Sequence, residues 1–318
     1  MQPKGIFCIS LDFELHWGVF DKKHLPEYGS YFDKTRALIP EMLALFEANE
    51  VHVTWATVAA LACAKGQELR DHLKTIQANY LNEALRAVRV GVGENEDMDP
   101  HHFAHSLIKE IKQVPGQEIG THTFSHFYTL EPGANQVAFS RDLALSSQYL
   151  DQPRSLVFPR NQYNEESLKV AKLAGVEVAR SNPKQWFWKT EAQSSEGLWK
   201  KVVRTLDHYF ALGSKTSYRY EATCKKDEQP LLMPASRFLR PPSVLDKLLP
   251  GFKLRRIKNE MTRAAKNGEI YHLWWHPHNF AVNSRRSFDE LKAILEHFKS
   301  LNAQYDFKSL NMGELADL

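Results

Sequence analysis

The chain contains few cysteines, little net charge and no long apolar run, and each absence excludes a class of protein. Its 318 residues include three cysteines, Cys8, Cys63 and Cys224, which lie far apart and form no C-x-x-C pair. This odd, scattered set argues against a disulfide framework. The formal net charge of +3 is too small to indicate a nucleic-acid partner by itself. No run of 18 or more apolar residues occurs, so no membrane-spanning helix is expected.

The N-terminus also lacks the pattern of an export signal, because its apolar run, "GIFCISL", is short and leads directly into two acidic residues. Together with the scattered cysteines, this predicts a cytoplasmic protein, free in solution or at the inner face of the membrane. The composition, with 43% hydrophobic and 25% charged residues, is ordinary for a globular chain. The length is within reach of one α/β barrel.

Strand-like and helix-like segments alternate along the chain. Residues 5–11 resemble a buried strand, residues 35–49 have helical spacing, and residues 51–58 are again rich in strand formers. Residues 62–115 interrupt this rhythm and are predicted to form a helical insertion. The alternation then resumes, and residues 182–240 are expected to be irregular and rich in aromatic side chains. Strands are expected at 117–122, 155–159, 176–180, 269–276 and 305–310, and helices at 136–150, 165–175, 253–267 and 287–301.

About seven strand–helix units predict a distorted (β/α)7-type barrel with a helical insertion, built as a single domain over residues 1–318. In such a barrel, functional side chains collect at the carboxyl ends of the strands. Ionisable or polar residues follow five of the predicted strands, which indicates one shared site. They are Asp12 and Glu14, His122 and His126, Arg160, Asn182, and His276 and His278.

Two carboxylates stand two residues apart in "SLDFELHWG". On an extended strand end, Asp12 and Glu14 face the same side, and two like charges that close raise each other's pKa unless a cation lies between them. The alternative is a pair of solvated loop acids. The residues by themselves leave open which acid would bind a metal and which would act as a base.

Two histidines stand four residues apart in "THTFSH". If 122–126 forms a helical turn, His122 and His126 share a face, and two imidazoles with one carboxylate match the usual ligand set of a catalytic zinc site. The hydroxyls of Thr121, Thr123 and Ser125 are candidate partners for these ligands. Taken alone, the H-x-x-x-H spacing is weak, and capped or solvated histidines are the alternative.

Two further strand ends carry candidate catalytic groups. Arg160 in "FPRNQYN" can orient a carboxylate by a bidentate bond, although a surface arginine is the alternative. In "YHLWWHPHNF", His276 is the preferred general acid because Pro277 fixes the turn after it. His278 and His272 are weaker candidates, and a histidine satisfied by backbone partners is the alternative reading.

These segments, taken in order, resemble the motifs of the polysaccharide deacetylase superfamily, also called the NodB-homology or carbohydrate esterase family 4 group. The resemblance covers most of the chain outside about 62–115 and 190–240. It rests on "SLDFE", "VTWATV", "THTFSH", "FPRNQYN" and "LWWHP". The first motif departs from the common T-F-D-D form and is closer to a D-x-D or D-x-E branch, which includes intracellular cyclic-amide hydrolases and lipid-linked sugar deformylases. "SNPKQW" stands where the family's fourth motif is expected, with Asn182 in place of an acid.

The resemblance implies a metal-dependent hydrolase that removes an N-acyl group, most simply N-acetyl, from an amino sugar. It assigns the metal to Glu14, His122 and His126, the base to Asp12, the orientation of that base to Arg160, and the acid to His276. The expected metal is zinc, with cobalt, manganese, nickel or iron as alternatives. Weaker substrate contacts are expected from Trp17, Asn161, Trp186, Trp188, Trp275 and His278.

Several alternatives remain open at this point. The same barrel could serve a sugar N-deformylase, a cyclic-amide hydrolase or a glycosidase, although a glycosidase needs two carboxylates flanking the scissile bond. A catalytically silent glycan-binding domain is the non-enzymatic alternative. Without an export signal, a nucleotide-linked, lipid-linked or soluble glycan precursor is the expected substrate, and no nucleic acid is expected as a partner.

One segment predicts a different kind of contact. Residues 245–268 contain seven lysines and arginines against two acids, a local net charge of 7 − 2 = +5, interleaved with large apolar residues. This pattern is typical of a basic amphipathic face that meets anionic lipid or a pyrophosphate-linked sugar. The alternative is an ordinary outer barrel helix with a solvated basic side.

Overall fold

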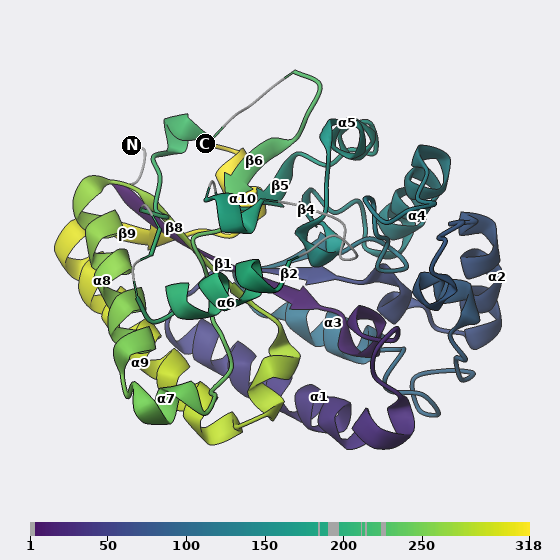
Figure 1. Ribbon diagram of the computed structural model, residues 1–318, viewed down its shortest axis with the longest axis horizontal. Helices are drawn as coiled ribbons and strands as arrows, with labels where there is room; N and C mark the ends of the chain where they lie inside the picture. Colours follow the sequence, from purple (N-terminus) through teal and green to yellow (C-terminus); the bar gives the residue numbers. More distant parts are fainter. Residues whose placement is uncertain (1–3, 184, 190–196, 211, 214, 224–226) are drawn as a thin grey trace.

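The computed structural model describes residues 4–183, 185–189, 197–210, 212–213, 215–223 and 227–318, and its centre is one parallel β-sheet (Figure 1). The strands follow the order β6-β5-β4-β3-β2-β1-β8-β7, and β9 pairs with the first residues of β1 on the edge opposite β8, ahead of β2. The bounds are β1 (Gly5–Phe13), β2 (Val53–Thr57), β3 (Gln117–Thr121), β4 (Ser155–Val157), β5 (Val178–Ser181), β6 (Leu231–Pro234), β7 (Arg237–Phe238), β8 (Ile270–Trp275) and β9 (Phe307–Ser309).

The two outer strands of this order, β6 and β7, are consecutive pieces of one stretch, residues 231–238. The first piece pairs with β5 and the second with β8. The backbone N–H of Ala235 donates to Ser181 of β5, and the N–H of the next residue, Ser236, donates to His272 of β8, both at 2.8 Å. This stretch therefore joins the two ends of the sheet. With β1 to β5 and β8 it makes seven strand positions, which confirms the predicted distorted (β/α)7-type barrel.

The expectation that residues 182–240 are irregular was wrong at this stretch. Its two pieces, β6 and β7, have four and two residues, which is too short for a periodic pattern to stand out. Pro234 and the change of hydrogen-bonding partner at Ala235 and Ser236 interrupt the run further. The same region also contains one amphipathic helix, Leu198–Asp207.

Helices cover the outside of the sheet (Figure 1). The long α1 begins earlier than its predicted start at residue 35, because Pro26 stands in its first turn, where a proline is well tolerated. No described helix is long and apolar enough to cross a membrane. The bounds are α1 (Leu25–Ala48), α2 (Gly66–Ile76), α3 (His105–Gln113), α4 (Gln136–Tyr149), α5 (Glu165–Leu173), α6 (Leu198–Asp207), α7 (Leu245–Leu248), α8 (Phe252–Asn267), α9 (Ser284–Tyr305) and α10 (Met312–Ala316).

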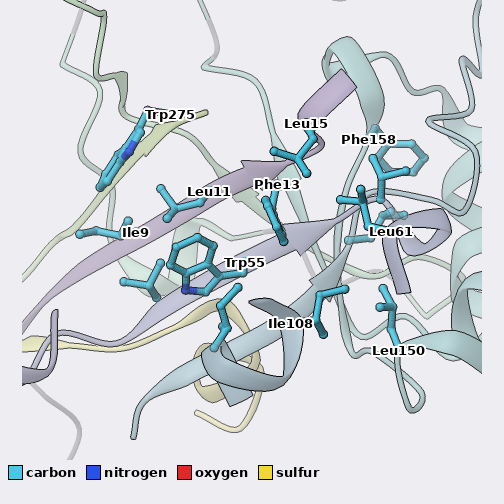
Figure 2. Close-up of a cluster of buried hydrophobic side chains, with 14 of the residues drawn as sticks. Ile9, Leu11, Phe13, Leu15, Trp55, Leu61, Ile108, Leu150, Phe158 and Trp275 are labelled. Atoms are coloured by element: carbon cyan, nitrogen blue, oxygen red, sulfur yellow. The ribbon is translucent and has the colours of Figure 1, made fainter. Parts of the chain in front are cut away.

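The two faces of β1 belong to two different layers. Side chains alternate along a strand, so Ile9, Leu11 and Phe13 point to the same side, where they join the large apolar cluster between sheet and helices (Figure 2). Cys8 points to the other side, into a smaller cluster inside the barrel. Residues 8, 10 and 12 share this inner side, so Asp12 lies there, near the end of β1. The fold therefore carries a carboxylate at the end of a buried inner row.

The 62–115 segment lies between β2 and β3 and contains α2, two short 3-10 turns and α3. Leu69 and Leu73 of α2 and Ile108 and Ile111 of α3 are buried in the same apolar cluster as the strands. Between the two helices, the chain runs back toward the turn that follows β1, where His102 meets that turn. The segment is thus packed onto the barrel beside the end of β1.

Candidate metal and acid–base site

Four parallel strands place ionisable side chains at one mouth of the barrel. Nε2 of His276 lies 3.6 Å from Oδ2 of Asp12 and 3.7 Å from Oε1 of Glu14, so one imidazole reaches both carboxylates. Segments far apart in the sequence therefore meet in one site. Its members are Asp12 in β1, Glu14 just after β1, His122 and His126 after β3, Arg180 in β5, and His276 after β8.

Glu14, His122 and His126 form the part of the site that can hold a metal ion. Their ligand atoms all lie within 4.8 Å of one another, and all three residues are buried. Oε2 of Glu14 lies 3.4 Å from Nε2 of His122 and 3.2 Å from Nε2 of His126. A carboxylate and two imidazoles are the ligand set of catalytic sites that keep positions open for water and substrate.

Hydrogen bonds orient both imidazoles toward Glu14. Nδ1 of His122 lies 2.7 Å from the carbonyl oxygen of Val157, which can only accept, so this nitrogen carries the proton and Nε2 presents a lone pair. That Nε2 is buried and has no hydrogen-bond partner. Nδ1 of His126 lies 3.0 Å from the hydroxyl of Tyr128. A buried, unpartnered lone pair beside a carboxylate is a feature that a bound cation would satisfy, so these residues fit a divalent metal.

The electrostatics of these residues suit a cation. Burial raises the pKa of Glu14, but the nearby imidazoles of His276, His122 and His126 lower it more, so its pKa lies well below its ordinary value. Burial lowers the pKa of His126 to about 4, against the opposing effect of Glu14. At neutral pH Glu14 is therefore ionised and His126 is neutral. These are the protonation states that bind metal.

The loop that carries both histidines is not the helical turn that the spacing suggested. Thr123 and His126 have positive φ angles, 67° and 57°, so the backbone bends through the left-handed region, and the bend brings the two imidazole centroids to 5.0 Å. The hydroxyls of Thr121 and Thr123 accept hydrogen bonds from the backbone N–H groups of Thr123 and Phe127. They hold the loop rather than the imidazoles, which corrects the expected role of these hydroxyls.

Asp142 of α4 is the second support of this loop, and it is a residue that sequence reasoning missed. Its carboxylate accepts from the backbone N–H of Phe124 at 2.6 Å and of Ser125 at 3.0 Å, and from the Ser125 hydroxyl. Burial raises the pKa of Asp142 to about 6, although these hydrogen bonds act in the opposite direction. The carboxylate thus fixes the bend between the two candidate ligands.

The turn after β1 is shaped around the Glu14 carboxylate. A Cβ atom on Gly18 would lie 2.0 Å from Oε1 of Glu14, so a larger residue at position 18 would displace that carboxylate. His16 in the same turn contacts His102 of the 62–115 segment (Nδ1 to Nε2, 2.8 Å), and Nδ1 of His102 contacts Asp99 at 2.8 Å. This buried chain ties the segment to the turn that positions Glu14.

Asp12 has a different partner, Arg180 of β5. The guanidinium donates from Nη1 to Oδ1 at 2.6 Å and from Nη2 to Oδ2 at 2.8 Å, a bidentate pair in which both residues are buried. Burial raises the pKa of Asp12, but Arg180, His276 and His122 lower it more, and the net pKa is below its ordinary value. The ring of Trp274 lies under the guanidinium, 4.1 Å from its carbon. Asp12 is therefore held ionised in one orientation.

The expectation that Arg160 orients Asp12 was wrong. Arg160 donates to Asp21 at 2.6 Å and lies over the Tyr128 ring at 4.1 Å, so it forms its ion pair at the rim of the site. Asn161, expected to contact substrate, instead accepts a hydrogen bond from Arg180 at 3.0 Å through its side-chain oxygen. Asn182 donates to the Asn161 backbone carbonyl at 3.2 Å. These two asparagines surround the arginine that holds Asp12.

The two histidines after β8 are stacked, with ring centroids 4.9 Å apart. The side chain of His276 is 24% exposed and faces both carboxylates, so it can meet a substrate. Nδ1 of His278 lies 3.9 Å from Glu14, and burial together with His276 lowers the pKa of His278 to about 3. His272 is fully buried below the site, where its Nε2 meets Ser10 at 2.8 Å. His276 is thus the histidine with both exposure and reach.

Two of the tryptophans expected to stack on a sugar are placed elsewhere. Trp17 is fully buried, and its indole donates to the His102 carbonyl. Trp275 is fully buried on the outer side of β8, stacked on Phe280, because side chains alternate along the strand. The tryptophan that borders the site is Trp274. Trp186 is 61% exposed in the loop after β5 and remains open to a ligand, whereas Trp188 is half-buried and has the Arg204 guanidinium over one face, 5.2 Å from the ring centroid.

A cavity of about 310 Å³ adjoins the metal-type cluster from the side of the 62–115 segment. Ser125 and His126 form one wall, and the segment supplies the opposite wall with Tyr80, Leu85 and Arg86. The hydroxyl of Tyr80 also accepts from the backbone N–H of Tyr128, the residue whose own hydroxyl contacts Nδ1 of His126. The segment therefore lines space that reaches a candidate ligand.

Comparison with known proteins shows the fold. No protein-family model matches the chain, and no curated protein matches it in sequence. Among solved structures, a protein of Mycobacterium smegmatis assigned as a polysaccharide deacetylase is similar, with a TM-score of 0.61 and 12% identity, over 100% of this chain and 90% of that one. The Puue allantoinase is similar with a TM-score of 0.54 and 9% identity, over 99% and 90% of the two chains.

A 4-alpha-glucanotransferase of Thermococcus litoralis is also similar, with a TM-score of 0.54 and 12% identity, over 100% of this chain but 40% of that one. The resemblance to polysaccharide deacetylases is thus confirmed at the level of the fold. Because the three names denote different activities on one type of barrel, the fold does not select the reaction. The choice has to come from the arrangement of the site.

Proposed function

We propose that this chain is a metal-dependent hydrolase that removes an N-acyl group, most simply N-acetyl, from an amino sugar. One observation carries the proposal. A metal-type cluster, Glu14 with His122 and His126, lies beside an arginine-held carboxylate, Asp12, and a single imidazole, His276, reaches both. Amide hydrolysis needs activation of the carbonyl, a base for water and an acid for the amine, and these groups can supply all three.

Glu14, His122 and His126 would hold the divalent ion, for which zinc is the first choice and cobalt, manganese, nickel and iron are alternatives. When bound, such an ion polarises the amide carbonyl and lowers the pKa of a water molecule. The protein fixes two imidazoles and one ionised carboxylate around that position. The loop contacts of Asp142 and the missing side chain at Gly18 keep the three ligands together.

Asp12 would accept the proton of the attacking water. Arg180 holds both of its oxygens, so the carboxylate stays ionised at neutral pH and has a fixed orientation. His276 would donate a proton to the leaving amine, because its Nε2 faces the carboxylates and its ring is partly exposed on the substrate side. Trp186 and Trp188 provide candidate stacking surfaces for a sugar, and Trp274 lies at the base of the site.

The arrangement argues against a glycosidase. That chemistry needs two carboxylates on either side of the scissile bond, separated by at least about 5 Å. Here both acids come from one strand end, within reach of the same nitrogen of His276. Asp12 is committed to Arg180, and Glu14 lies between imidazoles. Sugar N-deformylase and cyclic-amide hydrolase use the same groups on a different amide, so they remain the alternative substrates.

A silent glycan-binding domain would not need an oriented, unpartnered imidazole nitrogen at the centre of the site. The Nε2 of His122 is such an atom, which favours an enzyme. We further propose a cytoplasmic location, in keeping with the buried free thiols of Cys8 and Cys63, and a nucleotide-linked or lipid-linked amino sugar as substrate.

Elemental analysis tests the metal. The wild-type chain, purified without chelators, is expected to carry about one divalent ion, and His122→Ala is expected to lose it. His52→Ala is the matched control, because His52 pairs with Glu314 away from the mouth and should leave the metal in place. A wild-type chain that neither carries nor accepts a divalent ion would overturn the proposal. Acetate and formate release from amino-sugar amides would then identify the acyl group.

A further inference from the structure

The helix α6 exposes its apolar face instead of burying it. Trp199, Val202, Leu206 and Phe210 follow at intervals of three, four and four residues, so they share one side of the helix and its continuation. They are 79%, 46%, 41% and 42% exposed. An amphipathic helix of a globular protein normally turns this side to the core, so the exposed face points to a partner outside the described chain.

A second group of exposed apolar side chains continues this face. Val244 and Leu248 are 73% and 72% exposed, and Phe252 at the start of α8 is 40% exposed. The rings of Phe210 and Phe252 meet with centroids 6.2 Å apart, which joins the two groups. Figure 1 shows α6, α7 and α8 on the same part of the molecule, away from α2, α4 and α5. We name these seven residues, Trp199, Val202, Leu206, Phe210, Val244, Leu248 and Phe252, the α6–α8 surface.

The charges around the α6–α8 surface have one sign. Within the described residues 197–210 and 243–267, every aspartate and glutamate is buried, namely Asp207, Asp246 and Glu260. The exposed charges beside the surface are cations. Lys247 lies between Val244 and Leu248 in the sequence, and the Arg255 guanidinium lies over the Phe252 ring at 5.7 Å. The surface thus combines large apolar side chains with a basic rim.

The buried acids hold the surface in place. Glu260 pairs with Arg237 at 2.7 Å, and Asp207 pairs with Arg256 of α8 at 3.2 Å. Arg256 also donates to the backbone carbonyls of Asp207 and Phe210. These bonds join the end of α6 to α8. The apolar side chains therefore project from a fixed scaffold.

The scaffold under the α6–α8 surface is packed against the strand end that carries His276. His208, directly after α6, is buried and contacts the ring of Phe238 with centroids 6.1 Å apart. Phe238 in turn contacts His276, with centroids 5.8 Å apart. Two ring contacts thus connect the end of α6 to the proposed general acid.

We propose that the α6–α8 surface docks on an anionic lipid bilayer. A tryptophan and aliphatic side chains surrounded by lysine and arginine are the chemistry that settles at the boundary of headgroups and acyl chains. A second copy of the chain fits less well, because a symmetric contact would bring the same cations face to face. Nucleic acid fits less well too, since four of the seven side chains, Val202, Leu206, Val244 and Leu248, are aliphatic and offer no stacking surface for bases.

This docking has a consequence for the substrate, which rests on the proposed function. A barrel mouth held against the bilayer can receive a sugar attached to a membrane lipid without extracting it into water. The geometry therefore favours a lipid-linked amino sugar over a nucleotide-linked one. Binding to the bilayer itself needs neither metal nor turnover.

Vesicle co-sedimentation of the full chain tests the docking. The probes are vesicles of phosphatidylcholine and vesicles with about 30% phosphatidylglycerol, at low salt and at 0.5 M salt. We expect binding to the anionic vesicles at low salt, at least about tenfold weaker binding to the neutral ones, and weakening by salt. The same result is expected for His122→Ala. No binding of the wild-type chain to anionic vesicles at low salt would overturn the docking.

Paired variants locate the contact. Trp199→Ser with Leu206→Ser removes apolar area, and Lys247→Glu with Arg255→Glu reverses charge, with roughly fivefold weaker binding expected for each cation lost. Leu173→Ser in α5, where the residue is 89% exposed, and Lys109→Glu in α3 are the matched controls and should bind like wild type. Urea unfolding of each variant checks that it is folded. Equal losses in variants and controls would contradict the assignment.

Two further measurements separate the competing outcomes. If light scattering without vesicles shows a dimer that Trp199→Ser with Leu206→Ser abolishes, the surface is an interface between copies, and the docking proposal fails. If vesicle binding holds but no amino-sugar amide is hydrolysed by the metal-loaded chain, the proposed function fails and the docking stands. If a water-soluble amino-sugar amide is hydrolysed but the chain does not bind vesicles, the proposed function stands and the docking proposal fails.

Discussion

Asp12 and Glu14 stand two residues apart on the same strand end, yet they have different surroundings. Asp12 is bound on both oxygens by Arg180, whereas Glu14 lies between the imidazoles of His122 and His126. Each carboxylate is buried and each has a lowered pKa, but the Arg180 guanidinium neutralises the first, whereas among the described residues only histidines form ion-pair contacts with the second. The difference indicates that Asp12 acts on protons and Glu14 on a metal.

The division follows from which strand each acid faces. Arg180 comes from the interior of β5, and the two imidazoles come from the loop after β3. Because the guanidinium carries its charge permanently, the place beside Asp12 is already filled. The place beside Glu14 is bordered by the Nε2 atoms of two imidazoles, at 3.4 and 3.2 Å. The neighbouring residues therefore give Asp12 and Glu14 different roles, as a base and as a metal ligand. The predictions that follow test this difference.

The largest expected difference lies between two amide variants. Glu14→Gln should lower metal affinity by more than about 100-fold, since loss of even an outer partner of a metal ligand costs about 10- to 100-fold. Asp12→Asn should keep its metal within a few-fold and lose about 10²- to 10⁴-fold in kcat, the range of general acid–base catalysis. Metal titration and acyl-release assays measure the two quantities. Loss of metal in Asp12→Asn alone would reverse the assignment.

The two arginines should differ in stability. Arg180→Gln leaves the buried Asp12 carboxylate without its partner, and we expect a loss of about 3–5 kcal/mol in the free energy of unfolding. Adding Asp12→Asn should restore part of that loss, because the unpaired charge is then removed. Arg160→Gln, at the more exposed rim pair with Asp21, should cost less. Urea unfolding checks the series, and equal losses for both arginines would contradict the comparison.

The same pair predicts a pH dependence of stability in the metal-free chain. The pKa of Asp12 is lower in the folded state than in the unfolded chain, so its ionised form stabilises the fold. That contribution is fully present above the unfolded pKa, near 3.9, and is lost as the pH falls through the lower folded value. In Arg180→Gln, burial remains without the arginine, so the loss should begin at a higher pH. Unfolding curves between pH 3 and 7 with a chelator measure the shift.

A methyl group at position 18 should affect the Glu14 side alone. In Gly18→Ala, the new Cβ would lie 2.0 Å from the carboxylate, which has to move away from the imidazoles. We expect metal affinity to fall about 10- to 100-fold, with a change in unfolding free energy near 1 kcal/mol. Gly91→Ala is the control, because no atom lies within 4 Å of a Cβ there. An unchanged metal affinity in Gly18→Ala would show that Glu14 is not a ligand.

The smallest expected effect concerns the buried chain Asp99–His102–His16. Asp99→Asn should weaken the hold on His102 and so loosen the turn after β1, lowering metal affinity by about tenfold. Arg180 and Asp12 lie outside this chain, so the pH dependence of turnover in the metal-loaded variant should stay as in wild type. Metal titration with a competing chelator detects the change. If Asp99→Asn changes the pH profile of turnover but keeps normal metal affinity, the contacts of Asp99, His102 and His16 support Asp12 and not Glu14.

Much of the fold was predictable, because barrel strands and amphipathic helices have distinct periods. The strand after residue 4, the helices over 136–150 and 165–175, and the aromatic strand before His276 were all expected and are present. The stretch 231–238 was not, since two short pieces with different partners give no repeating pattern. The choice of partner there depends on strands far away in the sequence.

The site was predictable in its members and less so in its contacts. Spacing brought Asp12 and Glu14 to one side of a strand, but the arginine that reaches Asp12 comes from β5 and not from the motif that carries Arg160. The alternation of "VEVAR" places Arg180 on the same side as Val178, a buried inner position, and this signal could have identified it. Alternation along "YHLWWH" likewise predicts His272, Trp274 and His276 on one side of the strand and Trp275 on the other.

Gly18 and Asp142 had no comparable signal. A glycine's role depends on which atom would meet its missing Cβ, and here that atom is the carboxylate four residues earlier. Asp142 looks like any polar position of an amphipathic helix until the loop after β3 folds over it. Both depend on close approach of segments, which residue spacing does not record.

The stretch 231–238 also makes the two halves of the site depend on closure of the barrel to different degrees. Glu14, His122 and His126 come from the end of β1 and the loop after β3, and β1 and β3 are joined through β2. The metal-type cluster therefore lies within one continuous run of neighbouring strands. Arg180 comes from β5, which is four strands away from β1 along the sheet and is linked to β8 by the stretch 231–238. Because Arg180 reaches Asp12 across the interior of the barrel, opening the barrel at 231–238 would release the proposed base from its arginine and leave the metal ligands together.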